Sequence, residues 1–151
     1  MIPAACVTLL RRGQTNLEVL LVKRLLPPRA GLWALPGGKF EKDVDQTLMD
    51  TAVREMFEET GVRVQAEPNF YTKHTTGNGR FLLHHFLATN VLNDVRDVKA
   101  MTDASAVKWQ DVDSIIDSTW NEQFVEDLPI VLSRVKAHIG KDAIQIPSSP
   151  T

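Results

Sequence analysis

Cysteine is nearly absent from this chain of 151 residues, since Cys6 is its single thiol. One cysteine cannot form a disulfide within the chain, and it excludes a zinc site built from paired cysteines. Cys6 lies in the apolar run 4–10, so we interpret it as a small buried side chain rather than a nucleophile. With no disulfide to form, a reducing compartment is the default, and we expect a cytoplasmic protein.

A charge excess and a long apolar run are also missing. The formal net charge is −2, from 17 basic and 19 acidic residues, which gives no indication of a nucleic-acid partner or a membrane surface. The apolar start, MIPAACVTLL, is too short to span a membrane and lacks the basic residues of a secretion signal. The length and the hydrophobic share of 43% fit a single domain, 1–140, followed by a loose tail, 141–151, that is rich in proline and serine.

The sharpest chemical signal is the stretch REMFEETGV, which begins at Arg54. Read as a helix, it places Glu55 and Glu59 four residues apart on one face, and Glu58 borders the same face. Neighbouring carboxylates repel one another, at a cost of a few tenths of a kcal/mol per pair in an isolated helix. A divalent cation removes this repulsion, and hard oxygen ligands suit Mg²⁺, with Mn²⁺ as the alternative.

The ends of this helix can also be predicted. Asp43, with Gln46 three residues later, has the pattern of an N-terminal capping box, and Gly61 stands where a glycine commonly ends a helix. Before the helix, Gly37 and Gly38 predict a tight turn whose backbone can approach a ligand closely. An apolar stripe at helical spacing predicts packing on a core: Leu48, Ala52, Val53 and Met56.

A helix face rich in glutamate is most often simply solvated. Here a glycine turn, an Arg-Glu pair, two further glutamates and a terminal glycine follow one another in order, and this combination is hard to obtain by chance. We therefore favour a metal site over a solvated surface.

The order of these residues resembles the signature of the Nudix hydrolase family. In that signature a glycine and a glutamate precede Arg-Glu-aliphatic-x-Glu-Glu-x-Gly-aliphatic, and the second part matches without a gap from Arg54 to Val62. The first part departs, because the stretch from Gly38 to Arg54 is two residues longer than in the family. Gln46 also stands where the family has glutamate, and Asp43 or Asp45 can replace that carboxylate.

The resemblance implies an α/β fold, a Nudix-type α/β/α sandwich whose mixed sheet lies between the central and the C-terminal helix. We expect Glu55 and Glu59 to be the principal metal ligands, together with the carbonyl of Gly38. Glu58 is a further ligand or the base that activates water. Arg54 is expected on a different side of the helix from Glu58, where it orients the loop and the glutamates.

One more carboxylate is expected from the polar loop 93–103. In the family a loop after the long strand often supplies a metal ligand or a general base, so the resemblance makes Asp103 the favoured candidate. The alternative, that the acids of this loop are merely solvated, stays open.

Candidate substrate contacts flank the entrance to the acidic site. Arg24 and Arg29 can bind phosphates, and Trp33 can offer an aromatic face to a base. The alternative places Trp33 in the core and leaves both arginines solvated. Family members also often dimerise and complete the pocket across the interface, so a homodimer is possible.

The resemblance implies hydrolysis of a nucleoside diphosphate linked to another group, giving a nucleoside monophosphate and a phosphorylated remainder. The segments around the signature, such as PPRAGLWALPGG, look most like those of small ADP-ribose pyrophosphatases. Hydrolysis of nucleoside triphosphates is the alternative reaction. Two non-catalytic alternatives are a nucleotide-binding module with a Nudix fold and a purely structural domain.

Outside the signature, alternation and turn residues predict the remaining elements. The expected strands are 4–10 and 17–23, which form a hairpin, then 62–66, 70–75, 81–91 and 106–110. The expected helices are 114–117 and 120–139, the latter capped by Asn121 or Asp127. His84 and His85 are neighbours on a strand and should point to opposite faces, so we expect no zinc site there.

Overall fold

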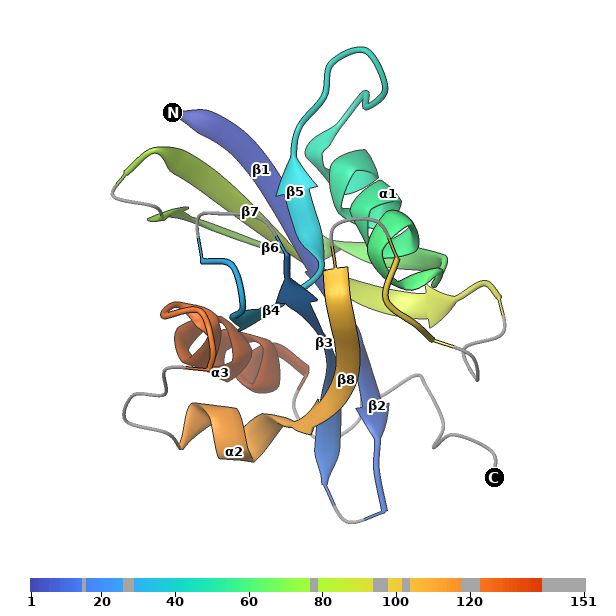
Figure 1. Ribbon diagram of the computed structural model, residues 1–151, viewed down its shortest axis with the longest axis vertical. Helices are drawn as coiled ribbons and strands as arrows, with labels where there is room; N and C mark the ends of the chain where they lie inside the picture. The colour runs from blue at the N-terminus through green and yellow to red at the C-terminus, as the bar shows by residue number, and fades with distance from the viewer. Residues whose placement is uncertain are drawn as a thin grey trace.

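The computed structural model describes residues 1–14, 16–25, 29–76, 79–93, 98–101, 104–117 and 123–139, without the side chains of 68–74 and 76. Figure 1 shows its elements in chain order: β1 (Ile2–Thr8), β2 (Leu10–Arg12), β3 (Leu17–Arg24), β4 (Trp33–Ala34), β5 (Gly37–Lys39), α1 (Leu48–Thr60), β6 (Val64–Thr76), β7 (Phe81–Val91), β8 (Ala104–Asp111), α2 (Val112–Ile116) and α3 (Leu128–Ile139).

The described strands form two sheets. The mixed sheet has the order β5–β1–β7–β6, in which β1 runs parallel to β7 and antiparallel to β5. In the antiparallel sheet, β3 pairs with β2, β4 and β8. The predicted α/β class and its mixed sheet are confirmed, and the second sheet is an addition that the sequence did not indicate.

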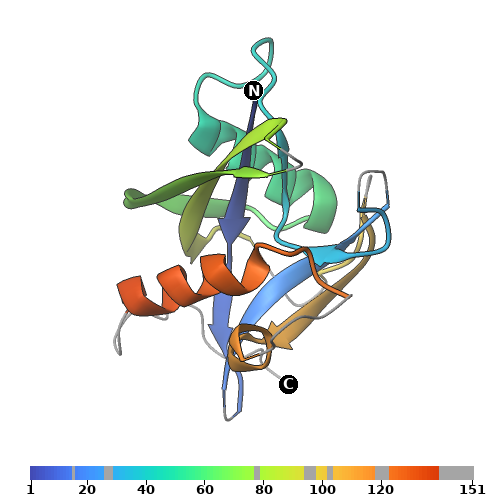
Figure 2. The same cartoon turned by 90° about the vertical axis from the view of Figure 1, so that its left-hand side faces the viewer.

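The two long helices cover opposite sides of β1, as Figures 1 and 2 show. Because side chains alternate along a strand, neighbouring residues of β1 belong to different cores. Ala5 and Val7 pack with Ala52 and Met56 of α1. Cys6 belongs to the second core, which contains Phe124 and the buried face of α3: Leu128, Val131, Leu132, Val135 and Ile139. The mixed sheet therefore has one face toward α1 and one face toward α3.

The first predicted strand is in fact two strands. β1 pairs with β5 and β7, and only the short β2 forms the hairpin with β3. The prediction that one strand, 4–10, forms this hairpin was therefore wrong. The chain passes from one sheet to the other at Leu9, which is fully buried and accepts a backbone hydrogen bond of 3.0 Å from Leu20.

Helix α1 begins later than predicted. Thr47 is the N-cap, its Oγ1 accepting from the N–H of Asp50, while the Asp50 carboxylate accepts from the N–H of Thr47 at 3.0 Å. The prediction of a cap at Asp43 was wrong, because the capping box uses Thr47 and Asp50 instead. The C-terminal prediction is confirmed: Gly61 has φ 78° and donates its N–H to the carbonyl of Phe57 at 2.8 Å.

Several other predicted boundaries differ from the structure, and two of the differences are large. β6 continues through the predicted break at 67–69, where its register against β7 shifts. Helix α3 begins at Leu128, not at residue 120, so the described residues 123–127 are not part of it. Instead, Trp33 donates its N–H to the carbonyl of Gln123 at 2.8 Å and accepts from the N–H of Val125 at 3.0 Å. Pairing with β4 thus delays the helix, and Pro129 falls in its first turn, where a missing N–H is tolerated.

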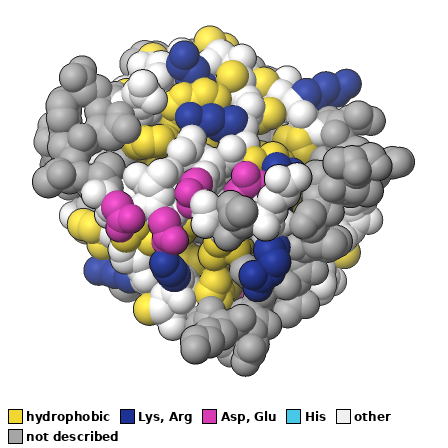
Figure 3. Space-filling view, turned by 90° about the horizontal axis from the view of Figure 1, so that it is seen from below, with side chains coloured by type: hydrophobic (Ala, Val, Ile, Leu, Met, Phe, Trp, Pro, Cys, Tyr) yellow, Lys and Arg dark blue, Asp and Glu magenta, His cyan; other side chains and the backbone are white. Residues whose placement is uncertain are grey.

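No described helix has the length and apolar character to cross a membrane. Figure 3 shows the molecule from below, where the β2–β3 hairpin and α2 lie in Figure 1. On this face acidic and basic side chains are interspersed among apolar and neutral ones. Among the residues described there, the surface has no continuous basic region of the kind that nucleic-acid backbones require.

Candidate functional site

Two glutamates of α1 meet the glycine turn at the edge strand β5. The carboxylate of Glu59 accepts from the N–H of Gly37 at 3.2 Å and is mostly buried. A Cβ atom on Gly38 would lie 2.5 Å from Cδ of Glu55, which is closer than such atoms can approach. The carboxylate of Glu55 therefore occupies space that only a glycine leaves open. The structure therefore places Glu55 and Glu59 at the glycine turn that contains Gly38.

Arg54 binds two of the glutamates directly. Its Nη1 donates to Oε1 of Glu55 at 2.9 Å and to Oε2 of Glu58 at 3.1 Å. The prediction that Arg54 lies on a different side of the helix from Glu58 was wrong, because residues four apart share one helix face. The guanidinium offsets the repulsion among these carboxylates, which agrees with the expected role of orienting them.

The same arginine is anchored by Asp45. Nε and Nη2 of Arg54 donate to the two carboxylate oxygens of Asp45, both at 2.9 Å. The side chain of Asp45 is only 2% exposed, and its Oδ2 also accepts from Oγ1 of Thr51 at 2.9 Å and from the N–H of Glu41 at 3.1 Å. The hydrogen bonds from Arg54 are the main cause that lowers the pKa of Asp45 to about 2. Of the two candidate acids in the loop, Asp45 therefore holds the arginine, and Asp43 is exposed.

Burial has the opposite effect on Glu55. It raises the pKa of this carboxyl group, and Arg54 opposes the rise only in part. A carboxylate that is costly to ionise in the free protein gains most from a cation. Arg54 supplies one positive charge, and a divalent ion near Glu55 would supply two more.

The donor set suits an ion that uses few protein ligands. Within the described part of the chain, no three Asp, Glu, His or Cys side chains are close enough to share one ion as they stand. Mg²⁺ commonly takes one or two carboxylates and completes its shell with water and substrate phosphates. Glu55 and Glu59 at the glycine turn fit that smaller set. Asp103, the other acid predicted for the site, lies outside the described residues.

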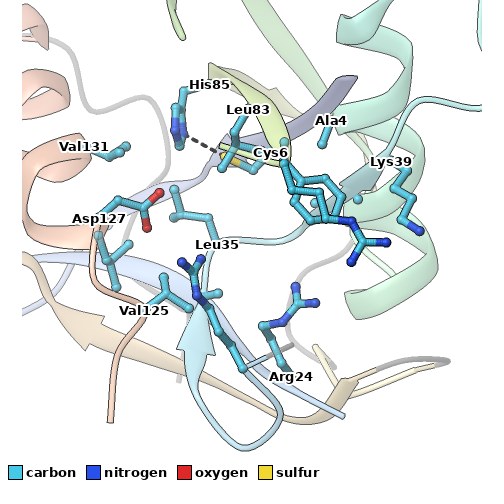
Figure 4. A pocket seen from close by; sticks show the side chains of 17 residues that line it. Ala4, Cys6, Arg24, Leu35, Lys39, Leu83, His85, Val125, Asp127 and Val131 are labelled. Atoms are coloured by element: carbon cyan, nitrogen blue, oxygen red, sulfur yellow. Dashed lines mark hydrogen bonds between the residues drawn. The ribbon is translucent and has the colours of Figure 1, made fainter. Parts of the chain in front are cut away.

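A cavity of about 280 Å³ opens beside the glycine turn, which forms part of its wall. The register of the mixed sheet places Cys6 between Gly37 on β5 and His85 on β7. All three line the cavity, together with residues two positions along each strand: Ala4, Leu83 and Lys39. The cavity thus lies on the α3 face of the sheet, where Figure 4 shows Cys6, Leu83 and His85 in its wall, and the glycine turn connects it to the glutamates of α1.

Cationic side chains surround part of this cavity. The structure places Arg24 and Arg29 in its lining, where the sequence had suggested substrate contacts. Lys39 and Arg80 line it as well and were missed. Lys39 is two residues after Gly37 and therefore lies on the same face of β5, so its place in the lining could have been predicted if this strand had been recognised. Arg80 directly precedes β7, and nothing local in the sequence indicated that its side chain reaches this cavity.

Trp33 and Arg29 have additional structural roles. The Trp33 ring is not part of the cavity lining; Nζ of Lys108 lies 4.3 Å from its centroid, and the ring packs against the core that contains α3. The side chain of Arg29 forms an ion pair with Glu126. The structure therefore groups Arg24 and Arg29 with the glycine turn but keeps the Trp33 ring apart from them.

The rest of the cavity wall is mostly apolar. It includes Leu35, Val125, Leu128 and Val131. Sγ of Cys6 lies 2.7 Å from Nδ1 of His85, and both side chains are buried. Burial raises the pKa of the Cys6 thiol well above its usual range, which favours the protonated form and agrees with a packed side chain. His84, by contrast, pairs with Ala5, whose side chain faces the α1 core, so the two histidines point to opposite faces as predicted.

The comparison with known families agrees with this geometry. A family model described as the NUDIX domain matches residues 1–128. The chain belongs to the Nudix family. Among curated proteins, this Nudix chain is 43% identical over 49 residues to the ADPR responsive transcriptional repressor NtrR of Acinetobacter baylyi. That match covers 32% of the chain and 20% of the repressor, so the chain spans a small part of this relative's length.

Solved structures show the same Nudix fold at low identity. The NUDIX domain of Shewanella oneidensis NrtR, complexed with ADP ribose, has a TM-score of 0.72 and 21% identity, over 93% of this chain and 89% of that one. A C. elegans Ap4A hydrolase binary complex has a TM-score of 0.70 and 19% identity, over 92% and 98% of the two chains. These similarities establish the fold.

Proposed function

We propose that this Nudix domain hydrolyses the phosphoanhydride bond of a nucleoside diphosphate linked to another group, with an ADP-ribose-like molecule as the favoured substrate. The products are a nucleoside monophosphate and a phosphorylated remainder. One observation supports this proposal above all. Glu55 and Glu59 converge on a glycine turn, and the same turn lines a cavity that also has four cationic side chains in its wall. The ADP ribose bound to a Nudix neighbour, and the ADPR response of a curated relative, support the choice of substrate.

Each side chain of the site has a role in this reaction. Glu55 and Glu59 would hold Mg²⁺ or Mn²⁺, with the Gly38 carbonyl as a further oxygen ligand. When bound, the ion neutralises charge on the diphosphate and lowers the pKa of a water molecule. Arg54, fixed by Asp45, keeps Glu55 and Glu58 in place before substrate binds.

The base that removes a proton from water has two candidates. The side chain of Glu58 is 45% exposed, so water can reach it, and Arg54 holds one of its oxygens. Asp103 is the second candidate. For the phosphates, Arg24 and Arg29 are the proposed contacts, and Lys39 and Arg80 add two charges at the same cavity. A stacking role for Trp33 is less well supported, because its ring lies outside the cavity lining.

Two alternative functions are also supported by specific observations. Hydrolysis of a nucleoside triphosphate is compatible with the cavity, because its cationic side chains can bind a triphosphate as well as a diphosphate. A binding module without catalysis is favoured by the repressor relative and by the longer loop before Arg54. For the present chain we propose a small-molecule nucleotide as the partner, without nucleic acid or membrane, and a homodimer stays a prediction.

Product analysis separates these readings. The protein is incubated with Mg²⁺ and, separately, with ADP-ribose, nucleoside triphosphates and dinucleoside polyphosphates, and the products are resolved by chromatography. AMP released from ADP-ribose, and no release after addition of a chelator, supports the proposed reaction. Pyrophosphate released only from triphosphates moves the protein to the alternative reaction. Absence of turnover with both Mg²⁺ and Mn²⁺ contradicts catalysis and leaves the binding module.

A further inference from the structure

The last turn of α1 has little intrinsic stability. The C-terminal end of a helix favours positive charge, but this turn has no basic residue and contains Glu58 and Glu59. Helix ends also fray more readily than helix centres, and Glu59 is the last residue but one of α1. A metal ligand at this position therefore depends on contacts that come from outside the helix.

Those contacts come from the segment between β7 and β8. The last carbonyl groups of a helix have no partner within it, and here the carbonyl of Glu59 accepts from the N–H of Met101 at 2.9 Å. The carbonyl of Gly61 accepts from Nδ2 of Asn93 at 2.8 Å. The two described parts of the segment, 92–93 and 98–101, are thus both bound to the end of α1, and Figure 1 shows the second part, in gold, beside the helix.

Asn93 makes two hydrogen bonds to the turn that follows the helix. Its Oδ1 accepts from the N–H of Arg63 at 2.9 Å, while Nδ2 donates to Gly61. A side-chain amide offers both a donor and an acceptor, a combination that neither a carboxylate nor an alkyl side chain has. Asn93 is exposed, so burial in a core does not explain its position. Its side chain instead fixes residues 61–63 in the left-handed turn that ends α1, where Gly61 has φ 78°.

Glu59 connects this end of the helix to the glycine turn. Its carboxylate accepts from the N–H of Gly37 at 3.2 Å, while its backbone carbonyl is held by Met101. The side chain is mostly buried, so a displacement of the backbone moves the carboxylate as well. Opening of the last helical turn would therefore take the carboxylate away from Gly37 and Gly38.

We propose that Asn93 is a positioning residue for Glu59. By closing the turn after α1, Asn93 keeps the last helical turn formed and holds the carboxylate at the glycine turn before a metal ion binds. The fraction of molecules in which this turn is formed sets the apparent affinity for the ion. The inference rests on the proposed function, because it assumes that Glu59 binds the metal.

The test measures Mn²⁺ binding in the absence of substrate, from the electron paramagnetic resonance signal of the free ion. Asn93→Ala should weaken Mn²⁺ binding by about two-fold to ten-fold, which corresponds to the loss of one ordinary hydrogen bond. At saturating Mn²⁺ the KM for ADP-ribose should be unchanged, because Asn93 does not contact the substrate. Asn90→Ala is the matched control, since it removes an exposed asparagine on β7 whose amide donates to Gln65 at 2.8 Å. Its dissociation constant for Mn²⁺ should equal that of the wild type.

Amide hydrogen exchange provides a second measurement, which starts from the wild type. In the metal-free protein the amide protons of Gly61 and Met101 donate to carbonyls of α1, so they should be protected from exchange. In Asn93→Ala both should exchange at least about two-fold faster. Fast exchange of both amides in the metal-free wild type would overturn the inference, because the turn would not be formed before the ion binds.

The other outcomes separate this inference from the proposed function. Equal Mn²⁺ affinity of Asn93→Ala and the wild type overturns the inference and leaves the proposed function standing. An equal loss of affinity in Asn90→Ala also overturns it, because the effect would then reflect general stability. A wild type that hydrolyses ADP-ribose but binds Mn²⁺ only with substrate present overturns the inference alone. A wild type that neither binds Mn²⁺ nor hydrolyses a nucleotide overturns both.

Discussion

Arg54 and Asp45 form a bidentate ion pair that connects the first part of the Nudix signature to the second. Both hydrogen bonds measure 2.9 Å, and the Asp45 carboxylate is almost completely buried. The signature expects a glutamate in the loop, and here the position eight residues before Arg54 is Gln46. Asp45, one residue earlier, supplies the carboxylate instead. The longer loop is therefore still bound to Arg54, the arginine that orients Glu55 and Glu58.

Replacing Asp45 with Asn should destabilise the protein. The change removes the negative charge between two nitrogens of Arg54 and leaves a partly buried cation with less compensation. We expect the free energy of unfolding to fall by about 2 to 3 kcal/mol, measured by urea denaturation at neutral pH. Asp43→Asn, in the same loop but exposed, should change it by less than about 0.5 kcal/mol. Equal stability of the two variants would contradict the anchoring role of Asp45.

The same pair predicts a pH dependence of stability. The pKa of Asp45 is lowered to about 2 in the folded protein, mainly by hydrogen bonds from Arg54, whereas the unfolded chain has an ordinary value near 4. The contribution of Asp45 is therefore present above about pH 4 and is lost as pH falls toward 2, with a total of about 2.5 kcal/mol. The difference in unfolding free energy between wild type and Asp45→Asn should shrink over this range. A difference that stays constant from pH 5 to pH 2.5 would contradict the assignment.

Local patterns predicted the parts of the site that lie on one element. The glutamates, their helix, the Gly61 terminus and the bounds of β7 follow from spacing and turn residues, which act over a few positions. The pairing of Arg54 with Asp45 could not be chosen over Asp43, because the conformation of the intervening loop depends on its contacts. Likewise, the start of α3 depends on hydrogen bonds to Trp33, about ninety residues earlier.

The lining of the cavity also could not be predicted from local sequence patterns. Cys6 and His85, which are 79 positions apart in the chain, are in contact because β1 runs parallel to β7. Parallel pairing leaves no local mark in either strand, so the sequence indicated a buried Cys6 and a strand histidine but not that they share a wall. Asp127 was predicted only as a possible cap of the C-terminal helix, because its place in the cavity lining depends on contacts between distant segments.

Substitution of Gly38 by alanine should weaken the metal site. The added methyl group would lie 2.5 Å from Cδ of Glu55 and must displace that carboxylate. We expect turnover to fall by at least about ten-fold and the Mg²⁺ concentration at half-maximal rate to rise, both measured in a metal titration. The control is Gly13→Ala, which places a methyl group 2.9 Å from a carbonyl in the distant β2–β3 turn. That variant should need no more Mg²⁺ than the wild type, and equal behaviour of both variants would argue against Glu55 as a ligand.

Arg24 should contribute to substrate binding. Its side chain lines the cavity beside the glycine turn, where a phosphate can accept from the guanidinium. Arg24→Gln should raise KM for the diphosphate substrate by about ten-fold or more, the size of one charged hydrogen bond, with a smaller effect on kcat. Arg134→Gln removes the same charge from an exposed position on α3 and serves as the control. An unchanged KM in Arg24→Gln would mean that the diphosphate lies elsewhere.

The most direct test of metal-dependent catalysis compares the wild type with Glu59→Gln. A glutamine at this position can still accept from the N–H of Gly37, so the fold and its thermal midpoint should be retained. The loss of one anionic ligand should lower the rate of AMP release from ADP-ribose by at least about a hundred-fold, while Glu18→Gln, in the β2–β3 hairpin, keeps the wild-type rate. A folded Glu59→Gln protein that hydrolyses ADP-ribose at the wild-type rate would contradict the proposed site.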